Sequence, residues 1–261
     1  MVDEAVKRNA VATSAGFGGG HSIGACFGDF DGDGHFDLFA GNFAHVDTRG
    51  DQPKSRFLKN LGAAKGWVFE DLHECGVWYQ ESYASPGAAD FDNDGRLDLL
   101  FTTVYADASF GKKNHAVLYR NEGEAGKPWS FADRTAGSGL ENLVPTYQAA
   151  WADVDGDGNV DVGTGGKLYL NKRAASGHWV AVRLVGDGVR VNRGAVGAQV
   201  RLALPDGRVL SRQVEVGTGE GNSNSPVLHF GVGEAKGPFA IEVRWGGGVV
   251  QRVEGVVGDR M

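Results

Sequence analysis

The chain has 261 residues, enough for one large domain or two ordinary ones, and its 41% of hydrophobic residues can form a sizeable core. No stretch approaches the roughly 18 apolar residues of a membrane helix, which argues against membrane insertion. The net charge is −7, but twelve of the 33 acidic residues lie in three short loops. The acidity is therefore better explained by bound cations than by a basic partner, and a nucleic-acid partner is not expected.

The start of the chain, Met1 to Ala5, is polar and acidic and has no apolar signal-peptide segment. Glycine is abundant, at 42 residues, a composition typical of many short strands joined by tight turns. There are two cysteines, Cys26 and Cys75. Because Cys26 lies in an apolar run, we expect a buried thiol there rather than a disulfide.

A nine-residue loop, D-x-D-x-D-G-x-x-D, occurs three times, at 29–37, 90–98 and 153–161. Position 4 holds residues that tolerate a positive φ: Gly32, Asn93 and Gly156. Converging carboxylates would repel by about 3 kcal/mol per pair, taking roughly 5 Å separation and an effective dielectric near 20. The loops therefore indicate a bound hard cation, and oxygen-only ligands in a flexible loop favour Ca²⁺ over Mg²⁺.

The loops differ from EF-hands, which have a glutamate at position 12 and a helix on either side. Position 12 here holds residues without a carboxylate: Ala40, Phe101 and Thr164. The flanking runs are short and rich in aromatic or β-branched residues, a pattern typical of strands. We therefore predict calcium loops that connect β-strands.

The expected ligands in each loop are the four aspartate side chains and the backbone carbonyl of position 7. They are Asp29, Asp31, Asp33, His35 and Asp37 in the first loop, Asp90, Asp92, Asp94, Arg96 and Asp98 in the second, and Asp153, Asp155, Asp157, Asn159 and Asp161 in the third. About three Ca²⁺ ions would bring the formal charge close to −1, and their role would be structural rather than catalytic.

The loops lie 61 and 63 residues apart, and the similarity continues beyond them. Phe57–Gly62 and Trp67–Asp71 follow the first loop, and Val117–Gly123 and Trp129–Asp133 follow the second. The third is followed by Leu168–Asn171, where the pattern ends. A period near 60 with about four strands per unit is typical of propeller blades. Closed propellers have 4–8 blades, so these two and a half repeats predict an open array.

The remainder of the chain shows period-two alternation of apolar and polar residues, as at 180–184, 198–204 and 241–245. Pro205-Asp206-Gly207 is typical of a turn between two strands. We predict a small β-sandwich or barrel of about six strands. The chain is thus expected to be all-β, with repeats over residues 1–175 and a second β-domain over 176–261.

The loops and the L-Y-x-N-x-G strand resemble FG-GAP/VCBS repeats of integrin α-type propellers. The region from about His178 resembles the ASPIC/UnbV domain that follows such repeats in the cartilage acidic protein family. The matching segments are His178–Leu184, Asn192–Ala198, His229–Gly233 and Val243–Trp245. The resemblance implies calcium binding, a place outside the cell or at its surface, and a role in adhesion or assembly.

Two functions remain open at this point. The first is a non-enzymatic, calcium-binding interaction or assembly module, since no nucleophile–base pair or cofactor motif is evident. The second is a carbohydrate-binding, lectin-like propeller with a sugar-stacking surface, although blade cores normally use such aromatics. The aromatic residues concerned are Trp67, Trp78, Tyr79, Trp129 and Tyr147.

An open array leaves an apolar face at each end, so we expect self-association or a protein partner. The first face is predicted near Phe27 and Phe39, and the last near Trp151 and Val162. The C-terminal domain is expected to cover the latter.

Overall fold

The computed structural model describes residues 1–11, 21–43, 46–47, 50–51, 55–77, 80, 83–108, 111–123, 129–173, 177–219 and 221–261. Within these ranges the chain is almost entirely β-structure, and the single helical element is a 3-10 turn, η1 (Ala63–Lys65). The prediction of an all-β chain is confirmed. None of the described segments forms a helix long and apolar enough to cross a membrane.

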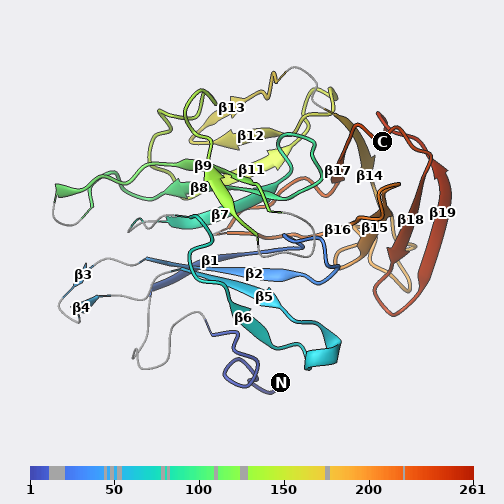
Figure 1. Ribbon diagram of the computed structural model, residues 1–261, viewed down its shortest axis with the longest axis horizontal. Coiled ribbons are helices and arrows are strands. Elements are labelled where there is room, and N and C mark those ends of the chain that lie inside the picture. Colours follow the sequence, from blue (N-terminus) through green and yellow to red (C-terminus); the bar gives the residue numbers. More distant parts are fainter. Residues whose placement is uncertain are drawn as a thin grey trace.

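The three loop-containing repeats form three small antiparallel sheets, here called blades 1, 2 and 3 (Figure 1). Blade 1 contains β1 (His21–Gly28), β2 (Asp37–Phe43), β5 (Arg56–Asn60) and β6 (Phe69–Asp71), in that order. Beside it, β3 (Val46–Asp47) and β4 (Gly50–Asp51) pair with each other. Blade 2 contains β7 (Tyr83–Ala89), β8 (Asp98–Thr103), β9 (Val117–Asn121) and β10 (Phe131–Asp133). Blade 3 has three strands, β11 (Ala149–Ala152), β12 (Asp161–Thr164) and β13 (Lys167–Tyr169).

The C-terminal region contains six strands in two sheets, as the alternating pattern predicts. One sheet pairs β14 (His178–Val182) with β17 (Leu228–Gly233). The other has the order β16 (Val209–Gln213), β15 (Gln199–Ala203), β18 (Phe239–Arg244) and β19 (Val250–Val256). Apolar side chains that alternate along these strands, such as Val200, Leu202, Phe230 and Val243, form a core of their own. The predicted boundary at 175/176 lies outside the described residues.

The blades pack face to face through aromatic and aliphatic side chains. Between blades 1 and 2, the ring of Phe39 lies 4.8 Å from that of Phe57 and 5.0 Å from that of Phe101. Phe39 is fully buried, so the prediction that it lies on an open face is wrong. The reason is strand alternation: Phe39 points toward blade 2, whereas Phe27 of β1 is 47% exposed.

A second core joins blades 2 and 3, where Leu100 and Leu118 pack with Trp151 and Val162. The prediction that the C-terminal domain covers Trp151 and Val162 is therefore wrong for Val162, which blade 2 covers. Cys26 lies in the first of these cores and both cysteines are free thiols, so the prediction of a buried thiol is confirmed.

The C-terminal domain instead lies against the first strands of the blades and against their loops. Residues 217–219 and 221–225 run past β1, β7 and β11. The N–H of Gly219 donates to the carbonyl of Ala25 (2.8 Å), and the N–H of Ser225 donates to that of Trp151 (2.9 Å). One irregular segment therefore contacts the inner edges of blades 1 and 3, which are more than 120 residues apart in the chain.

Candidate metal centres

Each aspartate loop connects the first two strands of its blade, so the predicted strand–loop–strand arrangement is confirmed. The turn in each loop depends on left-handed backbone at position 4, where φ is 73° for Gly32, 60° for Asn93 and 76° for Gly156. Glycine and asparagine adopt this conformation at low cost. The local sequence therefore determines the reversal that brings the carboxylates together.

Three carboxylates converge in each loop, with one oxygen from each lying within 4.8 Å of the others. The groups are Asp29, Asp31 and Asp33 in loop 1, Asp90, Asp92 and Asp94 in loop 2, and Asp153, Asp155 and Asp161 in loop 3. A hard cation such as Ca²⁺ takes oxygen ligands of this kind. The three predicted sites thus each present a cluster of oxygen donors.

The aspartate at position 9 also anchors the loop to the sheet through hydrogen bonds. The carboxylate of Asp37 accepts hydrogen bonds from the N–H groups of Phe30 (3.2 Å) and Asn60 (2.8 Å). Asp98 and Asp161 make the same pair of contacts in blades 2 and 3. In loops 1 and 2 this aspartate is outside the converging group, so its role as a ligand there stays a prediction.

The residue at position 7 is fixed by its own N–H, which donates to the position-5 carboxylate. This distance is 2.9 Å from His35 to Asp33, and the same contact is made by Arg96 and Asn159. It is an Asx-type turn that stabilises the loop locally. The use of the three position-7 carbonyls as ligands stays a prediction.

An asparagine at the end of the third strand, or just after it, links one blade to the next. The side-chain N–H₂ of Asn121 in blade 2 donates to the carbonyl of Phe30 in loop 1, at 2.8 Å. Asn171 in blade 3 donates in the same way to Phe91 in loop 2, at 2.8 Å. The asparagine of the L-Y-x-N-x-G pattern therefore serves in blade-to-blade contact, a role not evident from the sequence.

Basic residues outside the loops lie against the carboxylates of positions 3 and 5. The ammonium group of Lys59 contacts Asp31 and lies 2.7 Å from Asp33. Arg120 lies 2.6 Å from Asp92 and 2.8 Å from Asp94. In blade 3, Lys172 makes the corresponding contacts with Asp155 and Asp157. Sequence reasoning missed these pairs, although each basic residue lies next to the asparagine of its repeat.

Burial makes the negative charge of loops 1 and 2 costly. Burial raises the pKa of Asp29 to about 6 and that of Asp37 to about 8. In loop 2, burial raises the pKa of Asp90 to about 7, with Asp94 and Asp92 adding to the rise, and holds that of Asp98 well above its usual value. The buried Oδ1 of Asp29 has no hydrogen-bond partner among the described residues. A divalent cation would supply the missing positive charge and a partner for this oxygen, so the donor set fits such an ion.

The C-terminal domain completes the surroundings of loops 1 and 2. Arg201 donates to the carbonyl of Gly34 in loop 1 (2.7 Å), and the buried Arg212 donates to that of Gly95 in loop 2 (3.2 Å). The N–H of Gly231 donates to the carboxylate of Asp90 (3.0 Å). Loop 3 receives less cover, since Asp153 is half-buried and Asp155 is exposed.

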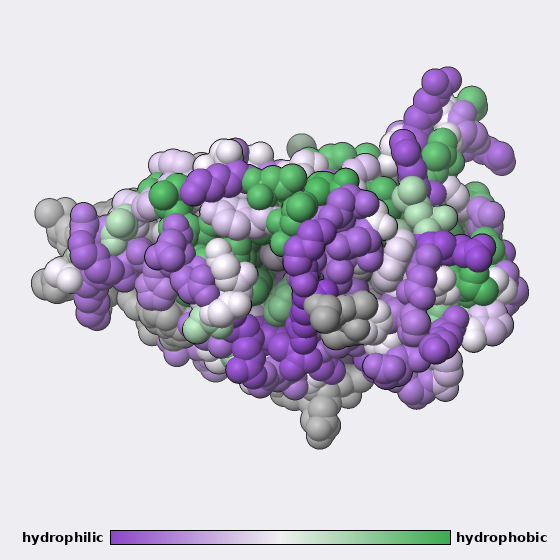
Figure 2. Space-filling view, turned by 90° about the horizontal axis from the view of Figure 1, so that it is seen from above, coloured by the Kyte–Doolittle hydropathy of each residue, from purple (hydrophilic) through white to green (hydrophobic). Residues whose placement is uncertain are grey.

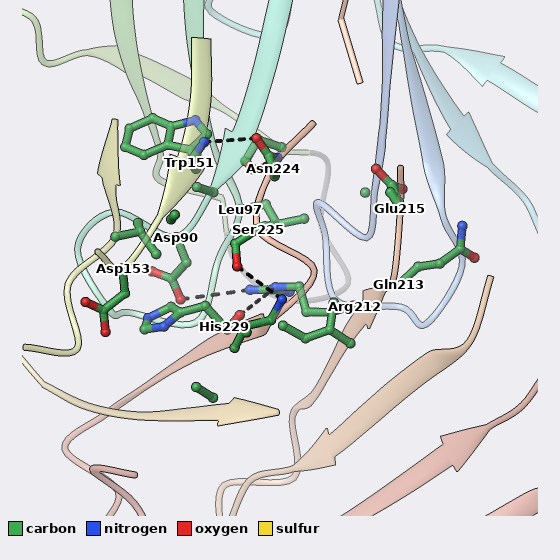
Figure 3. A pocket seen from close by; sticks show the side chains of 18 of the residues that line it. Asp90, Leu97, Trp151, Asp153, Arg212, Gln213, Glu215, Asn224, Ser225 and His229 are labelled. Carbon is green, nitrogen blue, oxygen red and sulfur yellow. Dashed lines mark hydrogen bonds and ion pairs between the residues drawn. The ribbon is translucent and has the colours of Figure 1, made fainter. Parts of the chain in front are cut away.

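A cavity of about 420 Å³ lies at this junction between the blades and the C-terminal domain (Figure 3). Asp90, Arg212 and His229 gather on one side, and Trp151 and Asn224 lie on the other. Arg212 lies 3.9 Å from Asp90 and donates to the carbonyl of His229 at 3.3 Å. Its charge therefore offsets that of Asp90 across the boundary between the two parts of the chain.

The structure describes three of the aromatic residues considered for sugar stacking. Trp129 is buried, with its ring 5.0 Å from that of Phe30, so it cannot stack on a sugar from solvent. Trp67 and Tyr147 are about half-exposed. Trp78 and Tyr79 lie outside the described residues.

These observations agree with comparisons to known families. Residues 90–164, which span most of blades 2 and 3, match the FG-GAP-like repeat. Residues 188–261 match the ASPIC and UnbV family. The first match covers the second and third aspartate loops, and the second covers most of the C-terminal domain.

The chain is also similar to cartilage acidic protein 1 from several vertebrates. It is 26% identical to the mouse protein over 234 residues, which cover 86% of this chain and 34% of the relative. The human protein is 25% identical over 234 residues, covering 86% and 33%. That of Xenopus tropicalis is 26% identical over 248 residues, covering 88% and 34%. The chain therefore spans about a third of the length of the relatives it matches.

Proposed function

We propose that this chain is a non-enzymatic, calcium-stabilised interaction module that acts outside the cell or at its surface. The FG-GAP-like repeats and the similarity to cartilage acidic protein 1 support this class of function. In the proposal, each loop holds one Ca²⁺ through its converging aspartates, and the ions stabilise the blades rather than take part in a reaction.

The observation that carries the proposal is the position of loops 1 and 2 between the blades and the C-terminal domain. Asp29 and Asp90 are buried there, and the pKa of each is raised to near neutrality by burial. Bound Ca²⁺ would keep these carboxylates ionised and would favour the packed arrangement of both parts. Calcium would thereby control whether the array and the C-terminal domain present one continuous surface.

The reactive side chains at the junction support a structural role. Cys26 and His229 both line the cavity. Burial raises the pKa of the Cys26 thiol to about 12, which disfavours the nucleophilic thiolate at neutral pH. The Nε2 of His229 is engaged by the side chain of Asn93. We therefore assign neither residue a catalytic role.

Calcium-dependent stability is the test of the proposal. Thermal unfolding is measured in excess EGTA, in Ca²⁺ and in Mg²⁺ at matched ionic strength. We expect the melting temperature to rise with Ca²⁺ concentration by mass action and to respond less to Mg²⁺. The variant Asp29→Asn should lose part of the calcium response, whereas Asp206→Asn, in a turn of the C-terminal domain, should keep it. A melting curve that is the same in EGTA and in Ca²⁺ would refute the proposal.

A further inference from the structure

Among the described residues, blade 3 differs from the other blades in having three strands rather than four. In blades 1 and 2, the third strands β5 and β9 lie between two neighbours and are almost wholly buried. In blade 3 the corresponding strand β13 is the edge of its sheet, and Leu168 at its centre is 56% exposed. Among the described residues, no strand pairs with this edge.

The fourth strand has a defined role where it is present. In blade 2, β10 pairs with β9 in the register Tyr119 with Asp133 and Asn121 with Phe131. The ring of Phe131 lies 6.1 Å from that of Phe30, which belongs to loop 1 of the preceding blade. Trp129, two residues earlier, lies 5.0 Å from Phe30 and 6.0 Å from Phe57. The fourth strand therefore seals the junction between two blades with two aromatic rings.

The equivalent place in blade 3 is hollow. Phe91 and Leu118 correspond to Phe30 and Phe57 in the preceding blade, and both line a cavity of about 720 Å³. Leu140, Tyr169 and Leu170 also line it. Figure 2 looks onto the side of the molecule where Figure 1 places β12 and β13, and hydrophobic residues gather near its middle between hydrophilic ones. The cavity thus lies where blade 2 has aromatic side chains, and these apolar residues share its wall with the basic residues Arg120, Arg134, Lys172 and Arg173.

The edge of β13 also presents the backbone groups with which an added antiparallel strand would pair. In blade 2, the N–H of Arg134 donates to the carbonyl of Leu118 (2.8 Å), and the N–H of Glu122 donates to that of Ser130 (2.7 Å). These contacts place the outward-facing groups of β9 on its even-numbered residues. The corresponding residues in blade 3 are Leu168, Leu170 and Lys172. Leu168 and Leu170 therefore offer their backbone groups to an added antiparallel strand.

We propose that the edge of β13 and the adjoining cavity bind an extended segment of another polypeptide, which adds as the fourth strand of blade 3. The segment has the pattern aromatic-x-aromatic-x-Asp, since both fourth strands in this fold have it: Trp67-Val68-Phe69-Glu70-Asp71 and Trp129-Ser130-Phe131-Ala132-Asp133. Its aspartate pairs with Tyr169 and its second aromatic residue with Asn171, and the aromatic rings fill the cavity beside Phe91 and Leu118.

A second copy of this chain is a poorer source of the strand. Both segments with this pattern are already paired within their own sheets, β6 with β5 and β10 with β9. Releasing Phe131 from its buried site would open the junction between blades 1 and 2. The partner is therefore a different chain that carries a free segment of this pattern.

The test is binding of a fluorescently labelled peptide with the sequence of residues 129–135 to the full chain in Ca²⁺, followed by anisotropy. We expect saturable binding that is lost when the peptide carries both Trp129→Ser and Phe131→Ser. In the protein, Leu170→Pro removes an outward N–H and should weaken binding about tenfold or more. Ala136→Trp, at an exposed residue that lines the cavity, should also block binding without removing a buried group.

Two controls make the result specific to this edge. Val154→Ser alters an exposed apolar residue outside the cavity and should leave the affinity unchanged. The melting temperature of each variant verifies that it is folded. Equal binding of the two peptides, no binding to the folded wild-type chain, or affinity unaffected by both Leu170→Pro and Ala136→Trp would overturn the inference. The inference specifies the interaction role proposed above. It would survive a missing calcium response, because peptide binding and calcium-dependent melting are separate measurements.

Discussion

The Nε2 of His229 lies 2.6 Å from the Oδ1 of Asn93, so a strand of the C-terminal domain is joined directly to the second aspartate loop. The side-chain N–H₂ of Asn93 donates in turn to the carbonyl of Gly158 in the third loop, at 3.0 Å. Because the amide oxygen of Asn93 accepts, Nε2 must be the protonated nitrogen of the ring. One asparagine at the turn of loop 2 thus connects three parts of the chain.

The His229–Asn93 contact predicts how stability depends on pH. Burial, with a contribution from Arg212, lowers the pKa of His229 to about 4. A folded-state pKa below the ordinary value of 6.5 means that the stability tied to the neutral ring is fully present above about pH 6.5 and is lost as the pH falls toward 4. In saturating Ca²⁺, wild type should therefore lose more stability over this range than His229→Gln. The variant His73→Asn, at an exposed histidine, should show the same dependence of stability on pH as wild type. An equal dependence in wild type and His229→Gln would contradict its assignment to His229.

The asparagines of blades 1 and 2 offer a matched pair for measuring the blade-to-blade contact. Asn60 and Asn121 each accept a hydrogen bond from a following glycine and donate to a carbonyl in their own loop. Of these two asparagines, only Asn121 is seen to donate also to the preceding loop, at the carbonyl of Phe30. Asn121→Ala should therefore cost about 1 kcal/mol more free energy of unfolding than Asn60→Ala. Urea denaturation in Ca²⁺ measures the difference, and equal losses would mean that this contact contributes nothing.

The position-9 aspartates should matter even without metal. Asp98→Ala removes the acceptor for two N–H groups, those of Phe91 and Asn121, and should cost about 2–4 kcal/mol in EGTA as well as in Ca²⁺. Asp155→Ala alters an exposed aspartate of loop 3 and should be costly only when Ca²⁺ is present. Chemical denaturation of both variants under the two conditions separates the roles. A loss for Asp98→Ala that vanishes in EGTA would show that its contribution is only that of a ligand.

Lys59 and a bound ion should compete for the same carboxylates. The Lys59→Met variant frees Asp31 and Asp33 from the ammonium group, so it should lower stability in EGTA while strengthening Ca²⁺ binding. We expect a gain in affinity of about tenfold, equivalent to about 1.4 kcal/mol. Isothermal titration measures it. The exposed Lys65→Met variant is the control, and an affinity unchanged by Lys59→Met would mean that cation and ammonium occupy separate positions.

The parts of this fold that could be predicted from the sequence are those set by local chemistry. The spacing of the aspartates and the glycine or asparagine at position 4 determine the loop, and side-chain alternation determines the strands. The repeat of the pattern then predicts two full blades and part of a third. Each of these features depends on residues close together in the chain.

The features that escaped prediction depend on contacts between distant residues. Lys59 reaches Asp31 across 28 positions, and Arg201 reaches Gly34 across 167. A lone arginine or histidine in an alternating strand gives no sign of which loop it will meet. The side of the blade toward which Phe39 points was also misjudged, because two faces of a sheet buried on both sides carry similar apolar residues.

The contact between Gly219 and β1 has a consequence for how the protein is synthesised. The bond from Gly219 to Ala25 spans 194 positions, so β1 acquires this contact only after nearly the whole chain has been synthesised. At 5–20 residues per second, blade 1 waits on the order of ten seconds or more with its inner edge unpaired. During that time β1 offers free backbone groups to any neighbouring chain. In nascent chains on one messenger, β1 can therefore pair wrongly with a neighbouring chain until the last domain emerges. This contact thus affects the yield of folded protein as well as its structure.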